Sequence, residues 1–405
     1  MNLGLSTSVI QRGKTGVAQY VFALVRALQP YAPAHRLILF ALEEDLPLLA
    51  FARNFAELVP VSEKWRPAVR NVFWHQFLLP RLARQHQLDA LHIPSYRRML
   101  WRGPCPLVAT IHDLAPFHVA RKYDRARMFY GRVVAKYLAH RQDRIIAISH
   151  NTAADIRRFF QVEESRLTVV HNGIDHSRFK PAPDDSARGW VADRYELKDP
   201  FFLYTARLEH PAKNHVRLIE AFTTFRRETG LPWQLVFAGS DWHGAEVIHA
   251  AIQSSAAAKA IHCLGFVPDQ DLPSLYQAAD VFIYPSMFEG FGLPPLEAMA
   301  CGCPVISSSR GSLGEIVRDA AHIVDPEDSA AMMVAMRDVA TDPGLRNLLR
   351  AKGFARAGSF RWEKTAAHTL AVYEAVWKDF GHRKNRRPGV PAQKPGLRSA
   401  SIGTK

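Results

Sequence analysis

Two carboxylates, Glu289 and Glu297, stand eight positions apart in a segment rich in glycine and proline. Glu289 lies in a loop after an apolar run that is typical of a strand. Pro294 and Pro295 suit the first turn of a helix, because the missing proline amide costs nothing there, so we expect Glu297 in that first turn. One acid in a loop and one on a helix can bind different hydroxyl groups of a polar ligand.

Two glycines, Gly290 and Gly292, follow the first of these acids. Without a Cβ atom their backbone can come close to a polar ligand. Each acid taken alone has a plainer interpretation, Glu289 as a solvated loop acid and Glu297 as a capping acid whose charge suits the helix dipole. Together with the glycine and proline frame, the pair favours a ligand site.

One guanidinium and one ammonium follow another strand-like run. Arg207 and Lys213 come after the apolar residues 201–205 and before a predicted helix. Doubly wound folds bind ligands at the carboxyl ends of their parallel strands. At that edge, the planar guanidinium of Arg207 and the compact ammonium group of Lys213 together form a clamp for a diphosphate. The alternative is a pair of surface bases that meet Glu209 or Glu220.

The first half offers two further candidates. Gly16 precedes a predicted helix, where the backbone can approach a phosphate or an acceptor; the alternative is a simple strand-to-helix turn. The adjacent Gly-Lys-Thr is not a phosphate loop, because that motif needs a glycine where Ser8 stands. His112 follows a buried strand and can hydrogen-bond a hydroxyl group or assist proton movement; the alternative is a structural histidine.

A metal site is not predicted. Asp269 and Asp271 have the spacing of a metal-binding acidic pair. Asp271, however, precedes Pro273 at the start of a predicted helix and is typical of an N-cap. No other cluster of histidines and acids has ligand spacing.

Short apolar runs alternate with amphipathic stretches, which is the pattern of parallel sheets built from β-α-β units. In the first half we predict a helix over 17–28 and strands over 2–6, 36–41, 89–93, 106–111, 144–148 and 167–170. In the second half we predict strands over 201–205, 234–238, 261–264, 281–284, 304–307 and 322–324. The helices predicted there are 214–229, 243–256, 271–278, 294–301, 312–318 and 328–338. The fold class is therefore expected to be α/β, with two Rossmann-like doubly wound domains that face a central cleft.

Turn-forming residues over 171–185 mark a domain boundary. We expect an acceptor-side Rossmann-like domain over 1–180 and a ligand-binding Rossmann-like domain over 181–361. A helix over 362–380 is expected to pack back on the first domain. Residues 381–405 have three prolines and no acids, and they are predicted to be a basic disordered tail.

The charge is unevenly distributed. Residues 1–180 carry 26 Lys/Arg against 13 Asp/Glu, whereas residues 181–380 carry 19 against 25. The stretches Lys64–Arg102 and Arg121–Arg144 interleave aromatic residues with bases. They indicate either a surface for anionic lipid or a lipid-linked acceptor, or ordinary helices with solvated basic faces. No motif points to a specific nucleic acid.

No run of apolar residues is long enough to span a bilayer, and no signal peptide is recognised at the N-terminus. We therefore expect a cytoplasmic protein, with peripheral contact at the inner face of the plasma membrane through the basic first domain and tail.

The combined motifs resemble glycosyltransferase family 4, the retaining transferases of the GT-B fold, over about residues 1–380. The pattern is similar to that of bacterial enzymes that build O-antigen or exopolysaccharide, mannosyltransferases among them. One departure is the loop before Gly16, where relatives often have paired glycines. The resemblance rests on 206–208 with Lys213 and Asn214, on 286–298, and on 172–175, 148–149 and 265–268.

The resemblance implies a role for each candidate. Arg207 and Lys213 resemble the diphosphate ligands, Glu289 the acid that contacts the donor sugar, and Glu297 the acid that binds the ribose. His112 resembles the first-domain histidine near the transferred sugar. The other implied donor contacts are the backbone over Gly290, Phe291, Gly292 and Leu293, and Val267 with Phe266 near the base.

The implied activity is metal-independent, retaining transfer of a hexose, with mannose favoured, and needs no cofactor. The donor is expected to be a GDP- or UDP-linked nucleotide sugar. The acceptor is expected to be a glycan or a lipid-linked sugar of surface polysaccharide synthesis. The alternatives are a sugar phosphorylase or nucleotide-sugar epimerase on the same fold, and a non-catalytic scaffold that binds glycan or membrane.

Overall fold

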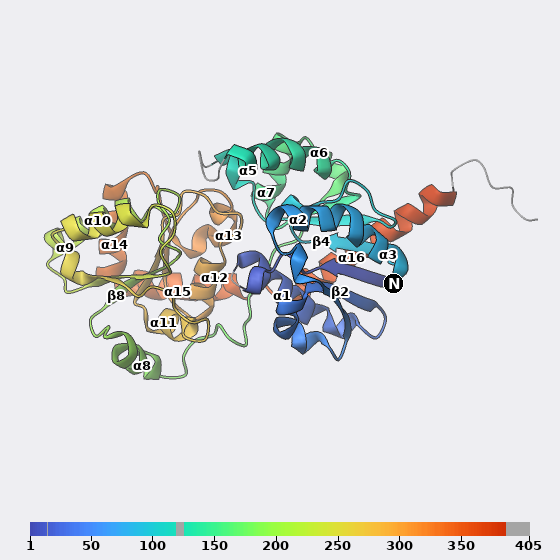
Figure 1. Ribbon diagram of the computed structural model, residues 1–405. Helices are drawn as coiled ribbons and strands as arrows, with labels where there is room; N and C mark the ends of the chain where they lie inside the picture. Colours follow the sequence, from blue (N-terminus) through green and yellow to red (C-terminus); the bar gives the residue numbers. More distant parts are fainter. Residues whose placement is uncertain (14, 119–124, 386–405) are drawn as a thin grey trace, which may run out of the picture.

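The computed structural model describes residues 1–13, 15–118 and 125–385, and these form two lobes (Figure 1). Within these residues, one parallel sheet has the strand order β3-β2-β1-β4-β5-β6-β7 and the other the order β10-β9-β8-β11-β12-β13. In both sheets the strand order reverses next to the first strand, which is the doubly wound arrangement that places ligands at the carboxyl edge. The predicted α/β class with two Rossmann-like sheets is confirmed.

The strands agree with the sequence pattern because most of them are buried on both faces and read as continuous apolar runs. The strands of the first sheet are β1 (Asn2–Ser6), β2 (Arg36–Leu42), β3 (Ala56–Val61), β4 (Ala90–Ile93), β5 (Leu107–Ile111), β6 (Arg144–Ala147) and β7 (Leu167–Val169). Those of the second are β8 (Phe201–Thr205), β9 (Gln234–Ala238), β10 (Ile261–Cys263), β11 (Val281–Tyr284), β12 (Val305–Ser308) and β13 (His322–Val324).

Helices cover both sheets. The first lobe has α1 (Gly16–Leu28), α2 (Ala68–Phe73), α3 (Leu79–Gln85), α4 (Ala115–His118), α5 (Arg125–Phe129), α6 (Ala135–Ala139) and α7 (His150–Asp155). Three of these helices continue directly into a π-helical turn. The π-helical turns are η5 (Trp74–Leu78), η7 (Tyr130–Val134) and η8 (Ile156–Phe160). The remaining helices are α8 (Ser186–Tyr195), α9 (His215–Thr229), α10 (Ala245–Ser254), α11 (Leu272–Ala278), α12 (Leu293–Ala300), α13 (Leu313–Val317), α14 (Ser329–Thr341), α15 (Pro343–Ala357) and α16 (Trp362–Asn385). No helix among the described residues is long and apolar enough to cross a membrane.

The last helix, α16, lies in the first lobe although it follows the second lobe in sequence (Figure 1). Its residues Ala366, Leu370, Tyr373 and Val376 are buried in the same core as α1. The tail beyond residue 385 lies outside the described residues, and the domain boundary at 180/181 stays a prediction.

Two chain segments cross between the lobes side by side. Ile174 donates its amide to the carbonyl of Phe360 at 3.2 Å and forms a bridge with Arg361. A Cβ atom at Gly173 would lie 2.2 Å from the amide nitrogen of Trp362, so only glycine fits there. The two chain segments that connect the lobes are therefore in direct contact with each other.

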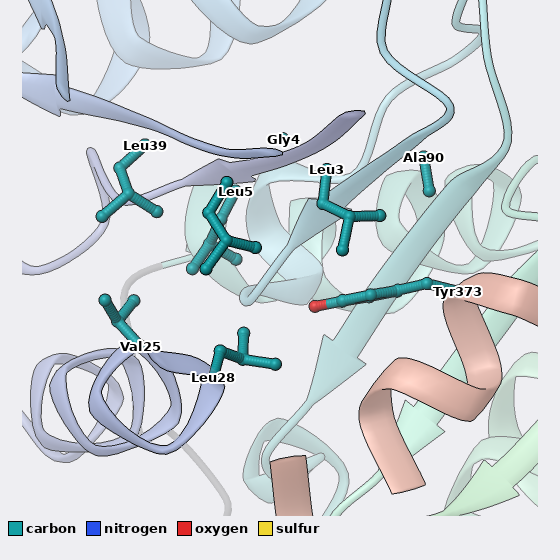
Figure 2. Close-up of a pocket in the computed structure, with 9 residues that line it drawn as sticks. Leu3, Gly4, Leu5, Val25, Leu28, Leu39, Ala90 and Tyr373 are labelled. Carbon is teal, nitrogen blue, oxygen red and sulfur yellow. The ribbon is translucent and has the colours of Figure 1, made fainter. Parts of the chain in front are cut away.

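A small apolar cavity of about 10 Å³ lies under the first sheet. Figure 2 shows the Tyr373 ring beneath Leu3 and Ala90, with Val25 and Leu28 of α1 to one side. This space is about the size of one water and its walls are mainly apolar, so it is a packing defect and not a ligand site.

Next to this cavity, Tyr373 enters a buried polar network. Its hydroxyl lies 2.7 Å from Nδ1 of His92, whose Nε2 lies 2.8 Å from the hydroxyl of Thr110. The Thr110 hydroxyl in turn lies 3.2 Å from that of Tyr20 on α1. Burial lowers the pKa of His92 to about 3, so its ring is neutral. The network fastens α16 to the two central strands β4 and β5.

We predict that Tyr373→Phe destabilises the first lobe by about 1–3 kcal/mol, because it leaves a buried nitrogen of His92 without a partner. Urea unfolding measures the loss. The control is Trp377→Phe, which removes an exposed bond to Asp89 and should cost well under about 1 kcal/mol. Equal stability of the two variants would contradict the role of the network.

Candidate functional site

The two motif segments of the second lobe meet at one edge of its sheet. Strands β8 and β11 are parallel neighbours, so the loops that follow them leave from the same side. The amide of Met287 donates to the carbonyl of Ala212 at 3.1 Å. The side chain of Asn214 donates to the carbonyls of Pro285 and Pro326 at 3.1 and 2.6 Å. The bonds to Ala212 and Pro285 join loop 206–214 to loop 285–291, and the bond to Pro326 connects Asn214 to the segment after β13.

Lys213 and Glu289 form an ion pair across these loops, with 2.6 Å between Nζ and Oε1. Their side chains are only 18% and 16% exposed. The hydroxyl of Tyr284 donates to the same carboxylate oxygen at 2.9 Å. Burial alone would raise the pKa of Glu289, but the charge of Lys213 and the hydrogen bonds outweigh burial and lower this pKa. Glu289 is therefore an anion at neutral pH.

Arg207 is the more exposed of the two cations, with 54% of its side chain accessible. Its guanidinium lies 4.5 Å from the centre of the Trp242 ring and 3.5 Å from a carboxylate oxygen of Glu209. Stacking on the ring orients the guanidinium plane. The contact with Glu209 is an ion pair, as the plainer interpretation of Arg207 expects. The arrangement suits contact with an anion from solvent.

The position of Glu297 in its helix differs from the prediction. The helix α12 begins at Leu293 and has no acid in its first turn, so Glu297 lies in the second turn and is not a capping acid. Its Oε2 accepts a bond of 3.0 Å from Tyr276, whose hydroxyl is also 2.8 Å from that of Thr205. Burial raises its pKa to about 7, although the bond from Tyr276 acts the other way. Through Tyr276, Glu297 is connected to the end of β8, two residues from Arg207.

The loop 290–293 contacts the first lobe through its backbone. A Cβ atom at Gly290 would lie 2.2 Å from the carbonyl oxygen of His112, so this approach requires glycine. The hydroxyl of Ser149 donates to the carbonyl of Gly290 at 3.0 Å. Gly292 has φ 112°, which also favours glycine.

Phe291 is 5% exposed and packs 5.8 Å from the Phe360 ring. Its side chain is part of the interior, so only its backbone can face a ligand. Leu293 is the first residue of α12.

His112 lies at the end of β5, facing this loop. Its Nε2 is 3.1 Å from the carbonyl oxygen of Pro94, and Tyr20 packs edge-on against its ring at 4.7 Å. A carbonyl only accepts, so Nε2 carries the proton and Nδ1 is an acceptor. Burial lowers the pKa of His112 to about 4, so the ring is neutral at pH 7 and can receive a hydrogen bond.

The remaining candidate residues are Gly16, Val267 and Phe266. Gly16 is the first residue of α1, and an added Cβ there would meet nothing within 4 Å. Val267 is 7% exposed and belongs to the core of the second lobe, whereas Phe266 is 74% exposed. Of these two, Phe266 is the side chain accessible to a ligand.

Asp271 precedes α11 as predicted, but its side chain does not cap that helix. Its Oδ2 instead accepts bonds of 2.8 Å from Arg194 and from Tyr195 on α8. Across the described ranges, no three side chains of His, Cys, Asp or Glu gather in a way that could hold a metal ion.

Sequence reasoning missed the residues that hold the candidates in place. Tyr276, Tyr284 and Trp242 have no motif of their own and act through contacts between distant segments.

Glu315 on α13 is another residue that sequence reasoning missed. It accepts 2.9 Å bonds from the amides of His150 and Asn151 in the first lobe, and His171 lies 2.9 Å from it. Burial would raise the pKa of Glu315, but these hydrogen bonds outweigh burial and lower it. The signal that could have found Glu315 is the helix N-terminus at 150, which attracts an acid.

We predict that Glu297→Gln changes how stability depends on pH. A carboxyl whose pKa rises from 4.5 to about 7 on folding holds its proton in the folded state, so stability falls as pH rises through this window. The variant should lose this decline, worth roughly 2–4 kcal/mol between pH 5 and 8. Urea midpoints at several pH values test it, with the exposed Glu228→Gln as control. A wild-type profile in Glu297→Gln would show that burial does not perturb this acid.

Two protein-family models match the chain, one on each lobe. The model described as Glycosyltransferase Family 4 matches residues 14–178. The model described as Glycosyl transferases group 1 matches residues 193–356.

The O-antigen chain mannosyltransferase B of Escherichia coli is 29% identical over 396 residues, which cover 93% of this chain and 100% of that protein. Two solved structures share the fold. Sucrose-phosphate synthase from Thermosynechococcus elongatus has a TM-score of 0.75 at 20% identity, covering 94% of this chain and all (100%) of that one. Anabaena HepE in complex with UDP-glucose has a TM-score of 0.72 at 21% identity, covering 92% and 100%. Both lobes thus carry a glycosyltransferase domain, and the chain belongs to the family 4 glycosyltransferases of the GT-B fold.

Proposed function

We propose that this glycosyltransferase moves a hexose, with mannose favoured, from a GDP- or UDP-linked donor to a glycan or lipid-linked acceptor of a surface polysaccharide. The transfer retains the anomeric configuration and uses no metal. The observation that carries the proposal is the Lys213–Glu289 pair at the carboxyl edge of β8 and β11, with Arg207 on the same loop. The E. coli relative supports mannose and an O-antigen type of product. HepE, bound to UDP-glucose, supports a nucleotide-sugar donor.

The two cations stabilise the departing diphosphate. Charge grows on its oxygens as the glycosidic bond breaks, and fixed positive groups at that point lower the barrier. Arg207 and Lys213 supply two such charges in place of a divalent ion. Trp242 keeps the guanidinium oriented before the donor arrives.

The two acids and the histidine position the sugar and the ribose. Glu289 is an anion that accepts hydrogen bonds from hydroxyl groups of the donor sugar. Glu297, whose pKa is raised to about 7, accepts hydrogen bonds from the ribose hydroxyls through its carboxyl oxygens. Since Lys213 neutralises Glu289 and lowers its pKa, Glu289 is a poor nucleophile and positions the sugar without attacking it. The neutral His112 accepts a hydrogen bond from the side of the first lobe. The acceptor hydroxyl then approaches on the face of the leaving group, whose phosphate takes its proton, and contact between the lobes excludes water.

We predict that Lys213→Ala lowers the rate of transfer by about 10²–10³-fold, the size typical of losing one charge-stabilising group. It also leaves Glu289 partly buried without its cation, so donor binding should weaken. Transfer kinetics and donor titration measure both effects, with the exposed Lys259→Ala as control. Survival of binding and transfer at near wild-type levels would reject the clamp.

We predict that the donor stabilises the folded protein, by about 2.7 kcal/mol at 100 times its dissociation constant. Thermal unfolding with GDP-mannose and with UDP-hexoses identifies the donor.

Transfer should continue after treatment with EDTA, and NMR of the product should show the anomeric configuration of the donor. Loss of transfer with EDTA, or an inverted product, would contradict the proposed chemistry.

A further inference from the structure

One helical segment of the first lobe turns apolar side chains toward solvent. Val69, Phe73 and Phe77, on α2 and η5, are spaced four residues apart and are 70%, 54% and 59% exposed. The opposite side of the segment is buried through Trp74 and His75. An amphipathic helix ordinarily turns its apolar stripe to the core. Here a second apolar stripe faces outward.

A second segment repeats this pattern. Phe129, Val133 and Tyr137, over α5, η7 and α6, are also four residues apart and are 61%, 52% and 45% exposed. Its buried side consists of Ala135, Leu138 and neighbours in a separate core cluster.

Trp101 joins the two stripes. Its ring is 58% exposed and lies 5.7 Å from the ring of Tyr137. Its amide donates to the side chain of Gln76, the residue before Phe77, at 3.0 Å. The stripes thus lie on either side of one exposed tryptophan and form one surface. We call it the aromatic surface: Val69, Phe73, Phe77, Trp101, Phe129, Val133 and Tyr137.

The segments that carry the aromatic surface are basic. Residues 64–88, 90–112 and 125–142 contain no Asp or Glu. The guanidinium of Arg141 lies 4.9 Å from the ring of Tyr137, directly beside the surface. The exposed bases on these segments include Lys64, Arg70, Arg81, Arg84, Arg102, Arg132 and Arg141.

We propose that the aromatic surface rests in the headgroup region of an anionic lipid bilayer. Apolar stripes bordered by Lys and Arg are the composition of helices that lie in a membrane interface. Anionic headgroups attract such bases, and aromatic rings are favoured at the depth of the headgroups. The valines of both stripes have no π face on which bases of a nucleic acid could stack, so the composition favours lipid.

The aromatic surface adjoins the acceptor side of the candidate site. The side chain of Arg132 donates to the carbonyl of Pro116 on α4 at 2.6 Å. The chain leads from His112 directly into α4, and His118 at its end stacks on Phe288 of the second lobe at 4.2 Å. A bilayer under the aromatic surface is therefore close to the loop after β5, and under the proposed function it would present a lipid-linked acceptor there.

The test is flotation of the full chain with vesicles of phosphatidylcholine alone and of phosphatidylcholine mixed with phosphatidylglycerol. The wild type should float with the mixed vesicles and not with the neutral ones. Arg70→Gln/Arg81→Gln/Arg102→Gln should lower partitioning on the order of a hundredfold, since each base contributes about a fivefold factor. Phe73→Ser/Phe77→Ser/Trp101→Ser should abolish flotation. The control is Leu348→Ser/Phe354→Ser, which removes two exposed apolar side chains of α15 and should float like the wild type.

Each other outcome overturns the proposal. Absence of wild-type flotation, or equal flotation with neutral vesicles, rejects an anionic bilayer. Flotation of both triple variants like the wild type moves lipid binding to another part of the chain. Tight binding of single-stranded RNA that both triple variants lose, without flotation, assigns the surface to nucleic acid. Donor-induced thermal stabilisation, measured for every variant, confirms folding and tests the donor site independently of the lipid result.

Discussion

The ion pair between Lys213 and Glu289 is the interaction on which the candidate site of the second lobe depends. Its 2.6 Å contact joins the loops after two adjacent strands, and both partners are largely removed from solvent. Taking two charges out of water is costly, and only close geometry with further hydrogen bonds compensates. Tyr284 provides one of those bonds. The pair therefore fixes both loops at once and keeps a cation and an anion preorganised at the carboxyl edge of the sheet, where the proposed function needs them.

The first lobe contributes to this site through backbone contact. The carbonyl of His112 approaches Gly290 so closely that no side chain fits between them. Glu315 adds a polar contact by accepting two amides at the start of α7. His112 and loop 285–291 thus have a defined relative position, although they follow strands of different sheets. Movement of one lobe against the other would change both contacts together.

Much of the fold could be predicted from the sequence, because strands buried on both faces read as continuous apolar runs. The edge strand β3 was missed since Pro60 interrupts its pattern and most of its residues are only partly buried. Helix α8 was missed because it has only two buried residues, Ala187 and Val191. Helix α15 was missed because it contains two glycines, Gly344 and Gly353, which lower helix propensity.

The candidate site was predictable where residue type and strand ends coincide, as for Arg207, Lys213 and Glu289. It was not predictable where a contact depends on side-chain reach across the fold. The bond of Tyr276 to Glu297 spans 21 positions, and no local pattern indicates it. Helix α12 begins at Leu293, one residue before the predicted start, and this single residue moves Glu297 from the first turn to the second.

The position of α16 has a consequence for biogenesis. The sheet of the first lobe ends with β7 at Val169, but the helix that completes its core begins at Trp362. A nascent chain therefore leaves the ribosome with part of the apolar underside of its first sheet, the part beside α1 that α16 covers, exposed while the entire second lobe is still being translated. Chaperones that bind such surfaces have the longest access to this half of the polypeptide.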